Sequence, residues 1–229
     1  MSVKILYLTA TSIEAAALKN VRGIVSVSGG YRFGEFDIIP LVSGVGSIAT
    51  AWAMKEWISV NEKPHLAING GIAGSYKDAF INGDVVMPIS DCFADSGIED
   101  GENFLTLPEA GLCGANEFPY RDGYIFAKPK YTDQLKSIMK PVRAITVNTA
   151  TGSENTRDKL IKKFNPDIET MEGATFFYIC SMENVPFLAI RAISNRVETR
   201  NPNNWNIKFA LDNMSDKLRE IFIRLELQR

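Results

Sequence analysis

The sequence lacks the features that mark membrane-spanning, secreted, zinc-binding or disulfide-stabilised proteins. None of the apolar runs in its 229 residues approaches the roughly 20 residues that cross a bilayer. The N-terminal MSVKILYLTA has a short apolar run, without the longer apolar region and cleavage site of a signal peptide. The three cysteines, Cys92, Cys113 and Cys180, are widely spaced and form no C-x-x-C pair. These absences favour a reducing cytoplasm and predict neither a zinc site nor a disulfide framework.

An excess of charge of one sign is also missing. The chain has 25 Lys and Arg against 27 Asp and Glu, which gives a net charge of −2. Proteins that bind nucleic acid usually carry a clear basic patch, so we expect no nucleic-acid partner, and no membrane partner either. Hydrophobic residues make up 45% and charged residues 23% of the chain, as in ordinary globular proteins. We expect a single domain over residues 1–229.

Apolar runs bounded by Gly, Pro and Asn alternate with segments of helical periodicity, which is typical of α/β proteins. The expected strands lie at residues 4–9, 24–27, 36–42, 65–69, 83–89, 142–147 and 187–193. The expected helices lie at residues 48–59, 132–139, 171–184 and 207–227, with a further helix that Ser153 or Asn155 begins and Phe164 ends, and a short one that Ser12 caps.

The stretch from Asp167 to Asn195 combines buried elements with polar groups. Met171-Glu172-Gly173 opens a helix that is apolar almost all round, so this helix is expected to be buried. The following strand is apolar except for Arg191, and it ends in Ser194-Asn195. Buried polar groups must be paired, and a ligand is one possible partner. Arg191 either contacts that ligand or is tied to a carboxylate or carbonyls within the core.

Several other positions allow both a structural and a functional interpretation. Glu14 follows the tip of the first strand, where α/β sheets bind ligands, but an acid also complements the dipole of a helix start. Gly44, Gly46 and Ala49 fit the loose dinucleotide pattern G-x-G-x-x-[GA], or form a plain strand-to-helix turn. The only histidine, His65, lies at the start of a strand, away from the expected ligand end, so a catalytic role is not expected.

Two segments are expected to be loops. Residues 69–74, NGGIAG, contain three glycines that let the backbone approach a flat ligand, or that form a simple turn. Residues 95–121 show little periodicity and are rich in Gly, Pro and acids. Long irregular segments of this kind are usually functional or mobile, and we interpret this one as an insertion that forms a subunit interface or covers the site.

The stretch from 167 to 195 resembles the C-terminal signature of the purine nucleoside phosphorylase and nucleosidase superfamily. The methylthioadenosine/adenosylhomocysteine nucleosidases have a Met-Glu-Gly helix start and an Arg-Ala-Ile-Ser-Asp strand end. Met171-Glu172-Gly173 matches the first motif, and residues 191–195 match the second except that Asn195 replaces the aspartate. Shorter matches near residues 9–14, 43–51 and 69–74 extend the resemblance over most of the chain.

Within that superfamily, Asn195 and the following Arg196-Val197-Glu198-Thr199-Arg200-Asn201 and Trp205 are most similar to the futalosine hydrolases of menaquinone biosynthesis. The resemblance implies a three-layer α/β fold in which a central mixed, twisted sheet is flanked by helices. It also implies hydrolysis of a purine N-glycosidic bond, with release of hypoxanthine from futalosine. A homo-oligomer is expected by family precedent, and no cofactor or metal is expected.

The resemblance assigns roles to individual residues. Glu14 is the expected general base for water, Glu172 is expected to hold the ribose hydroxyls, and Asn195 is expected to bind the base edge; these three form the expected catalytic set. The other expected substrate-binding residues are Met171, Ala73, Gly74, Thr151, Gly152, Arg191, Arg196, Arg200 and Trp205.

Three alternatives stay open beside this interpretation. A nucleosidase for methylthioadenosine, or a phosphorylase, has the same fold, but the first strand end, Thr9 to Glu14, offers no cation for phosphate and a carboxylate that would repel it. A nucleotide-cofactor oxidoreductase rests on the glycine turn alone. A non-catalytic nucleoside-binding protein would share the fold without the chemistry.

Overall fold

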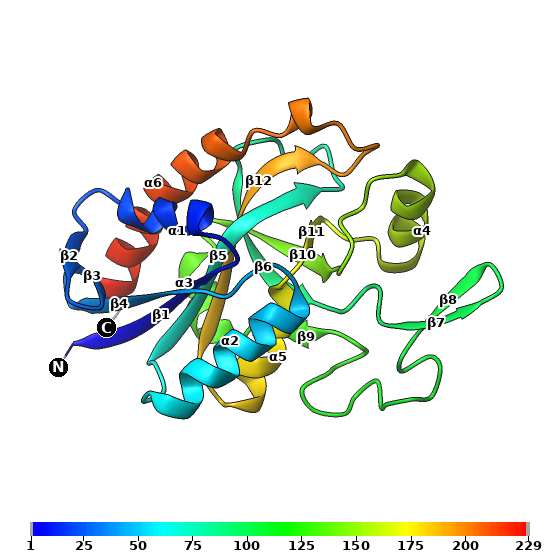
Figure 1. Ribbon diagram of the computed structural model, residues 1–229, viewed down its shortest axis with the longest axis horizontal. Helices are drawn as coiled ribbons and strands as arrows, with labels where there is room; N and C mark the ends of the chain where they lie inside the picture. Colours follow the sequence, from blue (N-terminus) through cyan, green and yellow to red (C-terminus); the bar gives the residue numbers. More distant parts are fainter. Residues whose placement is uncertain (1, 228–229) are drawn as a thin grey trace.

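The longest apolar runs form the inner strands of one ten-stranded sheet in the computed structural model, which describes residues 2–227 (Figure 1). The strands are β1 (Val3–Thr9), β2 (Val25–Val27), β3 (Gly30–Phe33), β4 (Phe36–Val42), β5 (Leu66–Ser75), β6 (Val85–Asp91), β7 (Gly97–Asp100), β8 (Asn103–Thr106), β9 (Ile125–Phe126), β10 (Lys140–Thr146), β11 (Ile168–Thr170) and β12 (Phe187–Arg196). The helices are α1 (Ser12–Lys19), α2 (Ser47–Val60), α3 (Pro129–Leu135), α4 (Glu154–Phe164), α5 (Gly173–Met182) and α6 (Ile207–Glu226), with a 3-10 turn η1 (Pro202–Asn204).

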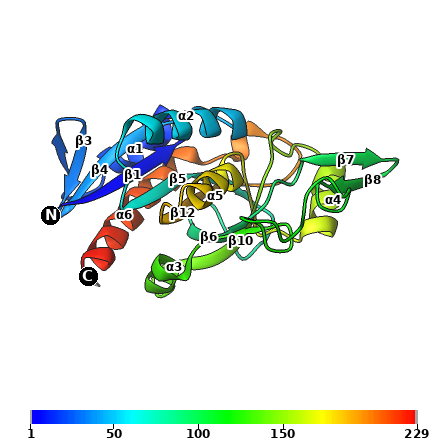
Figure 2. The same ribbon diagram turned by 90° about the horizontal axis from the view of Figure 1, so that it is seen from below.

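The sheet runs in the order β11-β10-β6-β12-β5-β1-β4-β3-β2, and β9 pairs with β6. Strands β4, β1, β5 and β12 are parallel to one another, so their carboxyl ends meet at one edge. Strand β11 pairs in parallel with β10 and antiparallel with β5, which closes β5, β12, β6, β10 and β11 into a ring. A separate hairpin, β7–β8, lies at the end of the molecule opposite the two termini (Figures 1 and 2).

Helices cover both faces of the sheet and give it three layers (Figure 2). Strand β1 shows how the sequence produces them, because its alternate side chains enter different cores. Ile5 packs in the cluster that contains residues of α1, α3 and α6, and Leu6 packs in the cluster that contains residues of α2 and α5. A parallel strand covered on both faces has the continuous apolar pattern seen here. The predicted three-layer α/β fold with a mixed central sheet is confirmed.

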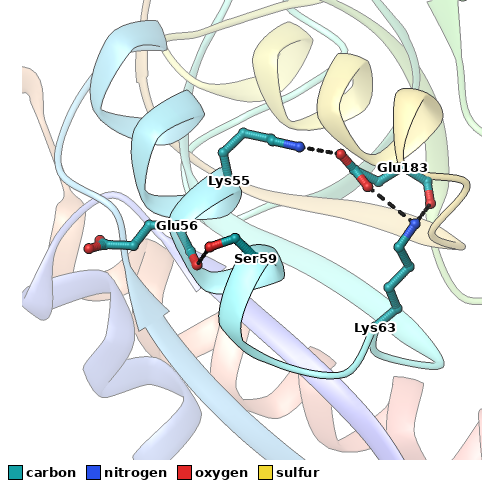
Figure 3. Close-up of polar contacts among 5 residues, drawn as sticks. All are labelled: Lys55, Glu56, Ser59, Lys63 and Glu183. Atoms are coloured by element: carbon teal, nitrogen blue, oxygen red, sulfur yellow. Dashed lines mark hydrogen bonds and ion pairs between the residues drawn. The ribbon is translucent and has the colours of Figure 1, made fainter.

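Helices α2 and α5 lie side by side on one face of the sheet. Lys55, within α2, and Lys63, just after it, both point toward Glu183, which follows α5 (Figure 3). Lys63 also donates to the main-chain carbonyl of Glu183 at 2.7 Å. Exposed ion pairs of this kind contribute little, about 0–1 kcal/mol each. The apolar contacts beneath them, which include Met54 and Phe177, therefore provide most of the stabilisation between the two helices.

The prediction of a glycine loop at residues 69–74 is wrong, because these residues continue β5 as far as Ser75. The glycines make room for neighbouring side chains instead of a turn. A Cβ on Gly70 would lie 2.1 Å from the hydroxyl oxygen of Tyr7, and a Cβ on Gly71 would lie 2.8 Å from Oε1 of Glu14. Glycine is therefore needed here for close approach within a strand.

The other departures from the predicted elements involve short segments. Strands β3, β9 and β11 and the hairpin β7–β8 are too short to show a period in the sequence. Helix α3 begins at Pro129, which suits a first helical turn, and ends at Leu135, so the predicted range 132–139 is too late. Thr11 caps α1 in place of Ser12, whereas Ser153 caps α4 as one of the two alternatives predicted. No helix among residues 2–227 is long and apolar enough to cross a membrane.

Candidate active site

A cavity of about 310 Å³ opens at the edge where β1, β5 and β12 end. Its walls come from segments far apart in the sequence. The lining residues are Ala10, Thr11, Ile13, Glu14, Val45, Ile72, Ala73, Gly74, Ala150, Thr151, Glu169, Thr170, Met171, Glu172, Ser194, Asn195, Val197, Trp205 and Ile207. This set contains three carboxylates and no Lys, Arg or His. The cavity therefore suits a neutral or developing positive ligand better than an anion.

Four helices begin at this cavity. The first turn of α1 contributes Ile13 and Glu14, the turn before α2 contributes Val45, and α6 contributes its first residue, Ile207. Glu172 is the N-cap residue of α5. The positive ends of these helix dipoles face the same space, which stabilises carboxylates placed there.

Glu14 is both a helix cap and a wall of the cavity. Its Oε2 accepts hydrogen bonds of 2.9 Å from the backbone N–H and from the hydroxyl of Thr11. Its Oε1 accepts from the N–H of Ile72 at 3.1 Å. The side chain is buried, and contacts with two different elements hold it in one position. Glu14 therefore both complements the dipole of α1 and faces the cavity, so the structural and the functional interpretation of this residue are compatible.

Glu172 lies opposite the start of α2. Its Oε1 accepts a hydrogen bond of 2.8 Å from the backbone N–H of Gly46, the N-cap residue of α2. Burial raises the pKa of the Glu172 carboxyl above its ordinary value, and the charge of Glu14 adds to the rise. The Gly46 N–H and the nearby Arg191 oppose that rise. The two carboxylates are thus close enough to influence each other, as a cation-stabilising site requires.

Arg191 lies behind the cavity wall and is 1% exposed. It donates hydrogen bonds to the carbonyl oxygens of Asn69, at 2.7 Å, and Ile190, at 3.0 Å, and also to the side-chain oxygen of Asn69. Burial lowers the pKa of the guanidinium, and the charges of Glu172 and Glu14 oppose this effect. Arg191 is therefore tied to carbonyl groups within the core, as one of the two sequence interpretations held. Its hydrogen bonds give no support to direct contact with a substrate.

Asn195 lies at the end of β12, beside a bulge that interrupts the pairing with β5 between Ile193 and Asn195. Bulges next to a site re-aim the side chain that follows them. The Asn195 amide donates to the carbonyl oxygen of Arg196 at 2.8 Å and accepts from the hydroxyl of Ser194 at 2.8 Å. An amide has two N–H groups, so one N–H of Asn195 has no partner among residues 2–227 and can donate to a ligand.

The structure brings most of the predicted substrate-binding residues to this cavity, but not all of them. Ala73, Gly74, Thr151, Met171 and Trp205 line it together with the predicted catalytic set. Gly152, Arg191, Arg196 and Arg200 do not.

Arg196 and Arg200 line an adjoining cavity of about 270 Å³. This cavity shares Ala150, Thr151, Asn195 and Trp205 with the first. Arg196 forms an ion pair with Asp78, an exposed residue outside this lining. The N–H of Arg200 donates to the carbonyl oxygen of Gly152 at 3.2 Å, which places Gly152 behind that wall. Arg196 and Arg200 therefore lie next to the predicted base-binding residue.

Sequence reasoning missed Glu169, the third carboxylate of the cavity. It lies in β11, a strand of three residues that has no pattern of its own. The one available signal was a charged residue directly after the apolar Ile168 and close to the Met171-Glu172 motif.

Two alternative interpretations of the sequence find no support at this site. The Nδ1 atom of His65 accepts from the N–H of Lys4 at 3.1 Å, before β5 begins and therefore at the opposite edge of the sheet. The N–H of Gly46 donates to the Glu172 carboxylate, so a negative charge already lies at the N-terminus of α2, where the pyrophosphate of a dinucleotide would bind.

Comparison with known proteins agrees with this arrangement. The chain belongs to the phosphorylase superfamily, whose sequence model matches residues 4–225. The futalosine hydrolase of Acidothermus cellulolyticus is 31% identical over 228 residues, which cover 92% of this chain and 87% of that protein.

Two solved structures share the fold along nearly the whole chain. The 5'-methylthioadenosine/S-adenosylhomocysteine nucleosidase of Helicobacter pylori, bound to butyl-thio-DADMe-Immucillin-A, superposes with a TM-score of 0.80 at 16% identity and covers 97% of this chain and 99% of its own. The native futalosine hydrolase of Helicobacter pylori gives a TM-score of 0.77 at 16% identity, over 100% and 99% of the two chains.

Proposed function

We propose that this chain hydrolyses the N-glycosidic bond of futalosine and releases hypoxanthine. The observation that carries the proposal is the pair Glu14 and Glu172 in a cavity whose lining contains no basic side chain. Cleavage of this bond passes through a sugar that resembles an oxocarbenium cation. Preorganised negative charge lowers the energy of that transition state.

The roles of the residues follow from their positions. Glu14 takes a proton from water as the water oxygen bonds to the anomeric carbon, and the bond between that carbon and N9 of the base breaks with its electron pair on the base. General-base catalysis of this kind contributes roughly 10²–10⁴-fold in rate. Glu172 holds the ribose hydroxyls, Met171 packs on the sugar, and the remaining N–H of Asn195 donates to the base edge.

Hydrolysis is favoured over phosphorolysis on electrostatic grounds. A phosphate entering this cavity would meet Glu14 and Glu172 with no lining Lys or Arg to neutralise it. Water is neutral and has no such requirement.

The choice of futalosine over other nucleosides rests on Asn195 and on the futalosine hydrolases among the relatives. Methylthioadenosine is the second candidate, because nucleosidases for it are also among the relatives. A homo-oligomer and a cytoplasmic location stay predictions from the sequence.

The test is a phosphate-free assay of base release from futalosine, inosine, methylthioadenosine and aminodeoxyfutalosine. We expect futalosine to have the highest kcat/KM and the sugar product to be the free sugar. A requirement for phosphate, with formation of a sugar 1-phosphate, would contradict hydrolysis. A preference for methylthioadenosine would leave hydrolysis in place and change the substrate.

A further inference from the structure

We propose that Glu169 is a second residue that reads the base, by accepting a hydrogen bond from N1–H of a 6-oxopurine. This inference rests on the proposed function and deepens it. It restricts the substrates to one class, the nucleosides whose base carries a hydrogen at N1. It also gives the cavity two polar contacts for the base, one from β12 and one from β11.

The placement of Glu169 follows from strand register. Gly74 in β5 pairs with Glu169 of β11 on one side and with Asn195 of β12 on the other. Neighbouring strands are about 4.8 Å apart, so the backbones of Glu169 and Asn195 are roughly 10 Å apart. Both side chains line the same cavity, and the residue between them has no side chain. The carboxylate and the amide therefore lie on either side of Gly74, and both face the cavity.

The space above Gly74 is limited by its neighbours. A Cβ on this residue would lie 2.8 Å from Cγ2 of Val197 and 3.3 Å from Nδ2 of Asn195. The missing side chain at Gly74 therefore makes room for Val197 and for the Asn195 amide, which lies against the backbone of β5 beside Glu169.

The hydrogen bonds of Glu169 leave one acceptor position unused among the described residues. Oε2 accepts from the hydroxyls of Tyr76, at 2.6 Å, and Thr151, at 2.5 Å. Oε1 accepts from the N–H of Thr151 at 2.9 Å. A carboxylate has about four lone-pair sites, and three of them are occupied here. Burial, and then the charge of Glu169, raise the pKa of Tyr76, so its hydroxyl remains a donor.

This arrangement distinguishes bases by their N1 atom. Hypoxanthine has an N–H at this position and can donate to Oε1 of Glu169. Adenine has a lone pair there, which faces a buried carboxylate that only accepts. A buried polar mismatch of this kind corresponds to roughly 5- to 150-fold in discrimination. Asn195 reads the O6 or N7 position, so the two residues test different atoms of one base.

The experiment compares adenosine with 1-deazaadenosine, in which C–H replaces the N1 lone pair and the 6-amino group is kept. Each compound is measured as a substrate, or as a competitive inhibitor of base release from inosine. We expect the wild-type protein to favour 1-deazaadenosine by at least about 5-fold. Glu169→Gln keeps the shape of the side chain and removes the negative charge that faces the N1 lone pair, so the preference should fall toward unity.

Tyr76→Phe is the matched control, because it removes one hydrogen bond to Glu169 and keeps the carboxylate. It is expected to retain the wild-type ratio. A wild-type ratio near unity, an unchanged ratio in Glu169→Gln, or an equal loss of preference in Tyr76→Phe would each overturn the role of Glu169.

Failure of the proposed function gives a different result, which is no base release from any nucleoside. In that case the dissociation constants of free hypoxanthine and adenine, measured by calorimetry for the wild type and Glu169→Gln, still test the contact. Hypoxanthine should bind more tightly to the wild type, and Glu169→Gln should reduce the difference by at least about 5-fold. An unchanged difference overturns the inference.

Discussion

The backbone N–H of Gly46 donates a hydrogen bond of 2.8 Å to Oε1 of Glu172, and this bond joins the N-termini of α2 and α5. The same two helices are linked at their C-terminal ends through Lys63 and Glu183 (Figure 3). The carboxylate of Glu172 is therefore held between the starts of two helices that pack against each other through apolar side chains. A carboxylate held in one position in this way is preorganised to bind the sugar.

Replacement of either acid is expected to remove most turnover while the fold survives. Glu172→Gln and Glu14→Gln keep the side-chain volume and remove the negative charge that stabilises the cationic sugar. We expect kcat to fall by roughly 10²–10³-fold for Glu172→Gln and by roughly 10²–10⁴-fold for Glu14→Gln. Steady-state kinetics with futalosine measures the loss of turnover, and circular dichroism of each variant shows whether the fold survives.

The matched control for these variants is Glu56→Gln, an exposed acid on α2 (Figure 3). It should keep the wild-type kcat. A Glu14 or Glu172 variant that is folded and has near-normal kcat would refute the role assigned to that residue.

A second prediction uses the space that Gly71 leaves for Glu14. The Cβ of Gly71→Ala would lie 2.8 Å from Oε1 of Glu14 and would displace the carboxylate. We expect kcat to fall by about 10²-fold, since a shift of about 1 Å in a catalytic group has effects of that size. The stability should change by less than about 1 kcal/mol, because only the end of a side chain has to move.

Gly70→Ala provides the contrast at the neighbouring position. Its Cβ would lie 2.1 Å from the hydroxyl of Tyr7, a fully buried side chain. Overpacking of a core costs typically 1–3 kcal/mol, so this variant should lose stability. Urea unfolding and kcat measured on both variants separate the two effects, and equal losses of stability would contradict the interpretation of Gly71.

The third prediction concerns Asp91, a buried carboxyl beneath the start of α5. Its Oδ1 accepts from the N–H of Cys92 at 2.8 Å and from the hydroxyl of Thr146 at 3.0 Å, and Oδ2 has no partner among residues 2–227. Burial raises the pKa of Asp91 from 3.8 to about 7, although Thr146 opposes the rise. The folded protein therefore binds a proton that the unfolded chain releases near pH 4.

The sign of the pH dependence follows from this raised pKa. Protonated Asp91 favours the folded state at low pH, and that contribution is lost as the pH rises from about 4 to about 7. Asp91→Asn should remove this loss of stability with rising pH. The free energy of unfolding of the variant minus that of the wild type should therefore increase by a few kcal/mol between pH 4 and pH 8. Urea unfolding at the two pH values measures it, with the exposed Asp216→Asn as control. Parallel pH profiles for wild type and Asp91→Asn would show that Asp91 titrates normally.

The sequence predicts the fold well where long apolar runs decide the structure. Strands such as β1 and β12 are buried on both faces, and their continuous apolar patterns place their polar ends at one edge. The sequence also places Glu14 and Asn195 at that edge, because Glu14 follows β1 and Asn195 lies at the end of β12, whereas Glu172 was added to them by the family resemblance. The family resemblance, not the pattern, assigned their chemistry.

The parts that could not be predicted depend on contacts between distant segments. Strand β11 has three residues, and its pairing with β5 joins Glu169 to Gly74, which lie 95 positions apart in the chain. Residues 69–74 look like a turn because three glycines are typical of turns, yet the glycines accommodate Tyr7 and Glu14 from other elements. Local propensity contains no information about those neighbours.

The fourth prediction concerns the benzoate that futalosine carries at its far end. A carboxylate of this kind needs a cation, and Arg196 and Arg200 are the two arginines expected to bind substrate. Arg200 is the better candidate, because Arg196 already pairs with Asp78. If Arg200 contacts the benzoate, Arg200→Ala should raise KM for futalosine about 10-fold or more, the usual size for a lost charge-assisted hydrogen bond, with a smaller effect on inosine. Arg196→Ala is the matched control and should change both substrates little. Equal increases in KM for both substrates would place Arg200 at the base or the sugar instead.

The last prediction tests how Asn195 selects the base. Hypoxanthine presents acceptors at N7 and O6, to which the free N–H of the Asn195 amide can donate. An ionised aspartate at this position would face the O6 lone pairs, but it would accept from the 6-amino group of adenine and, when protonated, donate to N7. We therefore expect the wild type to prefer futalosine over aminodeoxyfutalosine by roughly 5- to 150-fold in kcat/KM, and Asn195→Asp to narrow or reverse that preference. Asn195→Ser is a useful companion, because its hydroxyl can donate or accept and should give an intermediate ratio. If Asn195→Asp leaves the ratio of the two kcat/KM values unchanged, Asn195 only terminates β12 and does not read the base.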